Sequence, residues 1–266
     1  MLEKILVPIL PMHTKEAHIR IANFVQSMEA KYVHLLHVSS GGTAARLRLN
    51  DWIEKTALLY QEHTGSEVAT QIAEGHPAST ISYIAEELEM TLIYQWGNCK
   101  NIFWSTLLGS TTQDVIRLTE TPVFIQKCIP RVFNGEEVDR ILFATDFEAT
   151  AQRTIAVLKN MNHWSAKLFL LNVRGRAGDP FMDQRQRESI TEKMEDIKEE
   201  LITYFSQVEA QRAIGSPSKH ILAKAKKKKV DLIVLGRNNK PSILNITGST
   251  AENVIAKCRE SVLLVP

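Results

Sequence analysis

The sequence predicts an α/β protein built as two tandem three-layer α/β/α domains, and three observations lead to this. First, Gly97 and Gly109 recur as Gly236 and Gly248 at the same offset, which indicates an internal repeat. Second, apolar runs with a period of two or less alternate with segments of helical period, as in successive βαβ crossovers. Third, continuous runs of Val, Ile and Leu, such as residues 231–235, are typical of strands covered on both faces.

The strands are predicted by short apolar runs that occur in matching pairs. The order of the runs is the same in both halves, so we expect the halves to share one fold. The pairs are residues 5–8 with 141–144, 35–38 with 170–173, 92–94 with 232–234, and 122–125 with 261–264.

The helices are predicted by apolar residues at helical spacing between these runs. A turn containing glycine and proline, at residues 75–78 and 215–218, precedes a further amphipathic stretch in each half. The first half has its helical apolar residues at Ala17, Ile21, Phe24, Val25 and Met28, and over residues 53–60. The second half has them at Ala151, Ile155 and Leu158, and in a longer helix at Ile190, Met194, Ile197, Leu201 and Val208.

Two domains are predicted, at residues 1–130 and 138–266. Between them, residues 129–139 contain Pro130, Asn134 and Gly135 beside two glutamates, which is typical of a surface linker. Each half has the size of an ordinary domain and is long enough to bury its own core.

The composition excludes several classes of protein. With 44% hydrophobic and 23% charged residues the chain is expected to be globular, and its net charge of +2 argues against nucleic acid as an obligatory partner. No apolar run reaches the length needed to span a membrane, and the start lacks the apolar core of a signal peptide, so we expect a cytoplasmic protein. The cysteines, Cys99, Cys128 and Cys258, show no spacing typical of a zinc site or a disulfide framework.

The ends of the predicted strands suggest a ligand site in each half. In a parallel sheet, ligands bind beyond the carboxyl ends of the strands, where the strand order reverses. In the second half this brings together residues 145–146, residues 173–174 and the loop that closes on Gly248, Ser249 and Thr250. Small hydroxyl residues and glycines at a helix N-terminus can cradle a phosphate.

On these residues the chain resembles the universal stress protein family, in its tandem form, over essentially its whole length. The resemblance rests on the opening strand that ends at Asp146, the turn at residues 215–218, and the glycine loop before the last helix and a final apolar strand.

This resemblance implies a Rossmann-like, five-stranded parallel sheet in each domain, of the nucleotide α-hydrolase type, and pairing of like domains through their last strands. In one branch of the family it also implies binding of ATP or AMP, with magnesium as an accompanying ion. Carried over to the second domain, the nucleotide site would comprise Thr145, Asp146, Val173, Gly236, Arg237, Asn238, Gly248, Ser249 and Thr250.

Three departures from the family pattern weaken the implied sites. Leu10 replaces the aspartate in the first domain, so that domain is expected to have a degenerate site. The second loop glycine is replaced by Lys100 and by Asn239, and the spacer that follows has eight residues where the family has nine. Arg237 could compensate as a charge partner for phosphate.

Structural roles compete with these functional ones. Asp146 could cap a helix beginning near Glu148, and Ser110, Thr111, Ser249 and Thr250 could act only as N-caps. The lysine run at residues 224–229 is more simply a solvent-facing helix end than a nucleic-acid or membrane site. Trp96, Phe103 and Trp104 could plug the first pocket or form a contact surface, and the plug is the favoured interpretation.

Two functions remain open. The first is an adenine-nucleotide-binding stress-response sensor or regulator whose second domain holds the ligand. The second is a ligand-free interaction module with structural glycine loops. A homodimer fits either function. No catalytic or metal motif is present, so we expect a protein that is not an enzyme.

Overall fold

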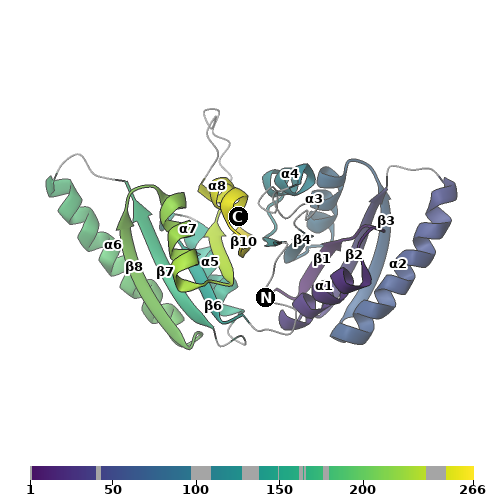
Figure 1. Ribbon diagram of the computed structural model, residues 1–266, viewed down its shortest axis with the longest axis horizontal. Helices are drawn as coiled ribbons and strands as arrows, with labels where there is room; N and C mark the ends of the chain where they lie inside the picture. The colour runs from purple at the N-terminus through teal and green to yellow at the C-terminus, as the bar shows by residue number, and fades with distance from the viewer. Residues whose placement is uncertain are drawn as a thin grey trace. The chain divides into compact units, whose positions relative to one another are not determined.

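The computed structural model describes residues 2–39, 43–96, 109–127, 138–148, 150–161, 164, 166–175, 180–237 and 250–266. These residues form two compact units, each a parallel sheet covered by helices (Figure 1). The first unit contains β1 to β5 and the second contains β6 to β10. The proposed linker, residues 129–139, lies mostly outside the described residues, so the domain boundaries at 130 and 138 stay a prediction.

The first unit has five strands in the order β3-β2-β1-β4-β5, with neighbouring strands parallel. Its strands are β1 (Lys4–Pro8), β2 (Tyr32–Ser39), β3 (Glu67–Glu74), β4 (Leu92–Trp96) and β5 (Val123–Gln126). Its helices are α1 (Lys15–Ser27), α2 (Thr43–Thr64), α3 (Pro77–Glu87) and α4 (Ser110–Leu118).

The second unit repeats this plan, with strand order β10-β9-β6-β7-β8 and parallel neighbours. Its strands are β6 (Arg140–Ala144), β7 (Lys167–Arg174), β8 (Gln207–Ile214), β9 (Leu232–Gly236) and β10 (Ser261–Val265). Its helices are α5 (Thr150–Lys159), α6 (Pro180–Leu201), α7 (Pro217–Lys228) and α8 (Thr250–Lys257). The predicted fold of two α/β/α domains with five-stranded parallel sheets is confirmed.

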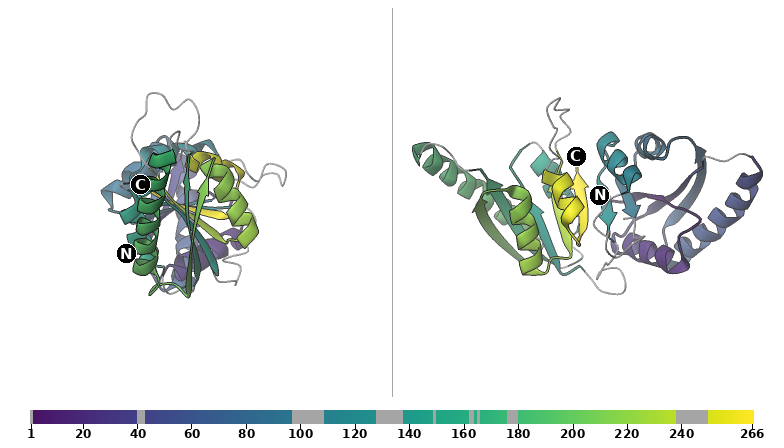
Figure 2. Two further views of the ribbon diagram at one scale, coloured as in Figure 1. Left: turned by 90° about the vertical axis from the view of Figure 1, so that its left-hand side faces the viewer. Right: turned by 45° about the horizontal axis from the view of Figure 1, so that its top comes forward.

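Helices cover both faces of each sheet (Figure 2). In the second unit α5 packs beside α6 on one face, while α7 packs beside α8 and against β6 and β7 on the other. In the first unit α1 packs with α2, and α3 packs with α4. The central strands are therefore almost fully buried, which is why apolar residues predominate in them.

The order of strands reverses between β6 and β9. From β6 the chain moves outward to β7 and β8, and then returns to the other side of β6 with β9 and β10. The two halves of the sheet thus diverge at the carboxyl ends of β6 and β9, where a crevice is expected in folds of this kind.

One helix prediction is partly wrong. Val208 was placed in the same helix as Leu201, seven residues earlier, but α6 ends at Leu201 and Val208 lies in β8. There it pairs with Leu168 of β7 and is buried. A spacing of seven residues fits two turns of one helix, and it fits a helix followed by a strand equally well. The periodicity alone could therefore not distinguish these two structures.

Three helices end with a non-glycine residue in the left-handed conformation. Glu29, Glu89 and Lys229 have φ of 52°, 49° and 52° and follow α1, α3 and α7. In each case the next residue is buried and its N–H donates to a carbonyl five residues earlier; Met90, for example, donates to Ala85 at 2.8 Å. This is the Schellman arrangement, which usually has glycine at the left-handed position.

Candidate functional site

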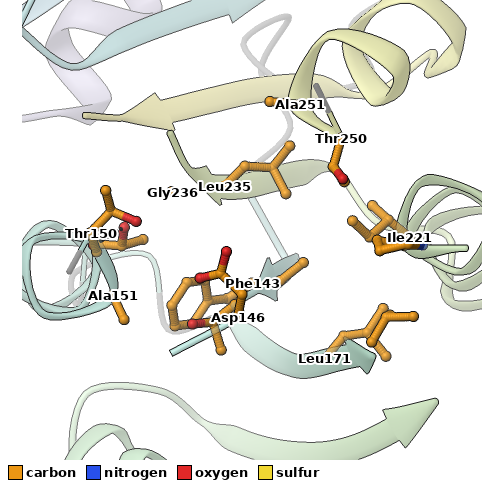
Figure 3. A pocket seen from close by; sticks show the side chains of 15 residues that line it. Phe143, Asp146, Thr150, Ala151, Leu171, Ile221, Leu235, Gly236, Thr250 and Ala251 are labelled. Carbon is orange, nitrogen blue, oxygen red and sulfur yellow. Dashed lines mark hydrogen bonds between the residues drawn. The ribbon is translucent and has the colours of Figure 1, made fainter. Parts of the chain in front are cut away.

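A cavity lies at the carboxyl ends of β6, β7 and β9 in the second unit, beside the first turns of α5, α7 and α8 (Figure 3). The described residues leave a volume of about 110 Å³, which suits one ring system better than a whole nucleotide. Its polar lining consists of Thr145, Asp146, Thr150, Thr154, Gly236 and Thr250, and its apolar lining includes Phe143, Leu171, Val173, Ile221 and Leu235.

Asp146 is the charged side chain among these lining residues. It follows β6 and is exposed to solvent. Its Oδ1 accepts a hydrogen bond from the N–H of Glu148 at 3.1 Å, and α5 begins only at Thr150. The carboxylate therefore stabilises a short turn before α5. It does not cap a helix that begins near Glu148, which was the structural alternative for this residue.

The turn after Asp146 holds Phe147 in the left-handed conformation, with φ of 65°. The hydroxyl of Thr145 accepts a hydrogen bond from the N–H of Phe147 at 3.0 Å. Lys193 of α6 places its ammonium 5.8 Å from the centre of the Phe147 ring. A bulky residue with positive φ is uncommon, so neighbouring contacts must maintain this turn and with it the direction of Asp146.

Val173 presents main-chain polar groups to the cavity edge. The carbonyl of Leu171 accepts a 3.0 Å hydrogen bond from the N–H of Thr145. Alternate residues of a strand direct their N–H and C=O groups to the same side, so those of Val173 face the space beyond the end of β6. A donor and an acceptor thus lie side by side next to the apolar lining.

Gly236 ends β9 directly beside the first turn of α5. A Cβ atom at this position would overlap the hydroxyl of Thr150 and would lie 3.1 Å from its Cβ. The glycine therefore allows close packing between the strand and the helix, and this role is independent of any ligand. The N–H of the next residue, Arg237, donates to the carbonyl of Val265 at 2.7 Å, and Arg237 is not among the cavity-lining residues.

The first residues of α8, Thr250 and Ala251, line the side of the cavity across from α5 (Figure 3). N–H groups at a helix N-terminus favour anions. Of the predicted site residues, the structure thus brings Thr145, Asp146, Val173, Gly236 and Thr250 to one cavity. Asn238, Gly248 and Ser249 lie outside the described residues, as do Lys100, Asn239, Phe103 and Trp104.

Sequence reasoning missed several lining residues. Thr150 and Thr154 lie one turn apart on α5, and the hydroxyl of Thr154 donates to the carbonyl of Thr150 at 2.8 Å. A pair of threonines on a helix gives no signal by itself. Pro217 and Ile221 lie on α7, which begins at the glycine and proline turn of residues 215–218, and the sequence did not place this turn at the cavity.

The first unit has no aspartate at the corresponding position, where Leu10 is 44% exposed. The strand register also corrects one part of the sequence alignment. Ile5 pairs with Leu92 in β1 and β4 as Ile141 pairs with Leu232 in β6 and β9, so Trp96 and not Gly97 corresponds to Gly236.

Trp96 therefore adds a large ring where the second unit has no side chain. The guanidinium carbon of Arg20 lies 5.3 Å from the centre of this ring, and the ring of His13 lies 6.2 Å away. That Trp96 plugs the first site together with Phe103 and Trp104 stays a prediction. The interpretation of Ser110 and Thr111 as N-caps is wrong. The N-cap of α4 is Gly109, and both residues lie within the helix.

The lysine run is the end of α7 and the residue that follows it, as the sequence suggested. Lys228 forms a 2.6 Å ion pair with Glu209 of β8, and its ammonium lies 4.7 Å from the centre of the Phe169 ring. Lys226, Lys227 and Lys229 are exposed.

Among the residues that the structure describes, no cluster of three His, Cys, Asp or Glu side chains could hold a metal ion. In the same residues, no helix is both long and apolar enough to cross a membrane.

Comparison with known proteins is consistent with the fold over both units. The universal stress protein family matches residues 1–127 and 137–266. Universal stress protein MJ0577 of Methanocaldococcus jannaschii is 28% identical over a region that covers 47% of this chain and 93% of that protein.

Solved structures show the same likeness. A universal stress protein from Archaeoglobus fulgidus superposes with a TM-score of 0.72 at 21% identity, covering 98% of this chain and 95% of that one, which shows the fold. A universal stress protein in complex with cAMP is 18% identical, with a TM-score of 0.42, and covers 49% of this chain and 98% of that one.

Proposed function

We propose that this chain, which belongs to the universal stress protein family, binds an adenine nucleotide, ATP or AMP, in its second unit. The observation that carries the proposal is the convergence of Asp146, Val173 and Thr250 on one cavity at the strand-order reversal. These residues supply a carboxylate, a main-chain donor and acceptor, and a helix N-terminus.

The chemistry of the cavity suits the parts of a nucleotide. The apolar lining of Leu171, Val173 and Ile221 suits a planar base, whose edge would meet the main-chain groups of Val173. Asp146 suits ribose hydroxyls, which donate hydrogen bonds to a carboxylate. The phosphates would extend toward the N-terminus of α8.

Magnesium would accompany the phosphates. Asp146 is the single carboxylate of the described lining, and Mg²⁺ bound with a nucleotide usually keeps several waters and phosphate oxygens as ligands. We therefore assign no protein residue other than Asp146 as a possible contact for the ion.

The first experiment is calorimetric titration of ATP and AMP into protein freed of ligand by denaturation and refolding, with mass spectrometry of any released compound. We expect about one nucleotide per chain. Asp146→Ala should weaken binding at least about tenfold, or ~1.4 kcal/mol. Glu148→Ala is the matched control, because Glu148 lies in the same turn but does not line the cavity. Equal affinities of wild type and Asp146→Ala would remove Asp146 from the site.

A second function, that of an interaction module without ligand, is favoured for the first unit by the Trp96 ring beside Arg20 and His13. Two nucleotides per chain would contradict this division of roles. Five expectations stay predictions: the sensor or regulator role, the absence of enzymatic activity, the cytoplasmic location, the pairing of domains through their last strands, and a homodimer.

A further inference from the structure

A cluster of imidazole and aromatic rings lies in the first unit, between the segment after β1, α1 and α2. The ring centre of His18 on α1 lies 5.7 Å from that of His13, 6.5 Å from that of Trp52 and 6.0 Å from that of Tyr60. His13 also lies near Trp96, as described above. His18 and Tyr60 are buried, at 5% and 0% exposed, whereas His13, Trp52 and Trp96 are half-buried, so the cluster extends from the core to the surface.

The hydrogen bond of His13 requires a neutral ring, and the surroundings of His18 favour one. Nδ1 of His18 faces the hydroxyl of Tyr60 at 3.4 Å, whereas its Nε2 is buried and has no hydrogen-bond partner. An imidazolium has two N–H donors, so a charged His18 would leave one of them buried and unpaired. Nδ1 of His13 accepts a 3.4 Å hydrogen bond from the N–H of Leu10, so this nitrogen carries no proton here.

The charged groups nearest the two rings on α1 do not compensate a positive charge. Arg20 brings its own cation to Trp96, and Lys15 adds a second one at the start of α1. Glu16 is exposed. Hydrogen bonds to its own main chain and to Thr14 lower the pKa of its carboxyl, and the charges of Arg20 and Lys15 lower it further.

The other elements packed on the cluster contribute rings and uncharged hydrogen bonds. His37 of β2 bonds to the carbonyl of Ile9 at 3.0 Å, and Tyr94 of β4 bonds to Gln126. The described charged side chains of α2 are exposed: Arg48, Asp51, Glu54, Lys55, Glu62 and His63.

These surroundings affect the pKa of both histidines in one direction. Burial, followed by the proximity of His13, lowers the pKa of His18 to about 4, and burial lowers the pKa of His13. Among the described residues, no carboxylate contributes to the pKa of either ring.

We propose that His13 and His18 form an acid-sensitive latch, which holds residues 9–14 and Trp96 in place while both rings are neutral and releases them when the rings are protonated. Protonation would create two imidazolium ions with ring centres 5.7 Å apart, and one of them, His13, would share the Trp96 ring with the cation of Arg20. Release would uncover the carboxyl ends of β1 and β4, the edge that corresponds to the cavity of the second unit. This inference does not depend on nucleotide binding there.

Hydrogen exchange with mass spectrometry on the full chain tests the latch, at pH 7 and pH 5 with exchange times scaled for the intrinsic rate. Residues 9–22 should exchange at least about tenfold faster at pH 5. The closed segment keeps the pKa of the buried histidine low, whereas the histidine of an open segment takes up a proton at this pH, so acid favours opening. Residues 78–87 of α3 in the same unit and residues 150–159 of α5, the counterpart of α1, are the internal comparisons, since neither segment contains a histidine.

Three variants separate the latch from general acid unfolding. His18→Phe should abolish most of the acceleration, and His13→Gln, which keeps an acceptor for Leu10 but does not titrate, should reduce it. His63→Gln, exposed on α2, should keep it in full. The proposal is overturned if the acceleration persists in His18→Phe and His13→Gln, or if residues 78–87 or residues 150–159 accelerate equally. If His18→Phe does not fold, His13→Gln decides.

Discussion

The side-chain amide of Asn172 donates a 2.9 Å hydrogen bond to the main-chain carbonyl of Thr145. In the first unit His37 makes the corresponding 3.0 Å bond to Ile9. Both bonds connect the end of the second strand of a unit to the residue that follows its first strand, so different side chains perform the same structural task. In the second unit the bonded residue directly precedes Asp146.

Asn172→Ala should therefore weaken nucleotide binding although Asn172 does not line the cavity. Loss of this buried bond loosens the turn that directs Asp146, and we expect a decrease of about fivefold, or ~1 kcal/mol. Asn172→His, which takes the residue from the first unit, should restore most of the affinity. Calorimetry on the three proteins provides the test, and a histidine variant as weak as the alanine variant would argue against this account.

Gly236→Ala should destabilise the second unit by about 1–3 kcal/mol, because the added Cβ overlaps the Thr150 hydroxyl. In a Thr150→Ala background the same change should cost at least ~0.5 kcal/mol less, since the overlapping oxygen is gone. Urea unfolding of the four proteins in this cycle measures the difference. Equal costs in both backgrounds would show that the close contact is not the reason for the glycine.

Glu89→Gly should stabilise the first unit by about 0.5–1 kcal/mol. Glu89 is exposed and has φ of 49°, a conformation that glycine adopts without steric cost. Glu86→Gly is the matched control, because Glu86 is also exposed but lies inside α3, where glycine should destabilise by a similar amount. Thermal unfolding should move in opposite directions for the two variants.

The stability of the first unit should fall on acidification below about pH 6.5. Burial lowers the pKa of His34, against the opposing effect of its hydrogen bond to Gln71, and the pKa of His18 is about 4. The folded unit thus binds fewer protons than the unfolded chain as the pH falls from 6.5 toward 4, and stability decreases over that window.

Urea midpoints at several pH values provide this measurement. His34→Gln retains a polar partner for Gln71 but cannot titrate, so its midpoint should depend less on pH than that of the wild type. A midpoint that is constant between pH 7 and 5 in the wild type would contradict the lowered pKa values.

Much of the fold could be predicted from the sequence, because central strands buried on both faces are mostly apolar runs. The end of α6 could not, since the spacing from Leu201 to Val208 fits a helix as well as a helix followed by a strand. The left-handed helix ends were also hidden, because Glu29, Glu89 and Lys229 lack the usual glycine signal.

The candidate site was predictable where a motif identifies it, as at Asp146, Val173 and Thr250. Thr150 could not be predicted, because its place at the cavity depends on how closely α5 approaches β9, a tertiary contact. The pairing of residues 92–94 with 232–234 matches Trp96 to Gly236, whereas the glycine repeat matches Gly97 to Gly236, and only the strand register decides between the two alignments.

The exchange of glycine for tryptophan at one strand end bears on how tandem proteins of this kind should be read. A sequence profile finds two domains in this chain, yet the residue ending the fourth strand of each domain differs from no side chain to the largest one. If Gly236 lies at a nucleotide site and Trp96 fills its counterpart, two domains of one family need not give two binding sites.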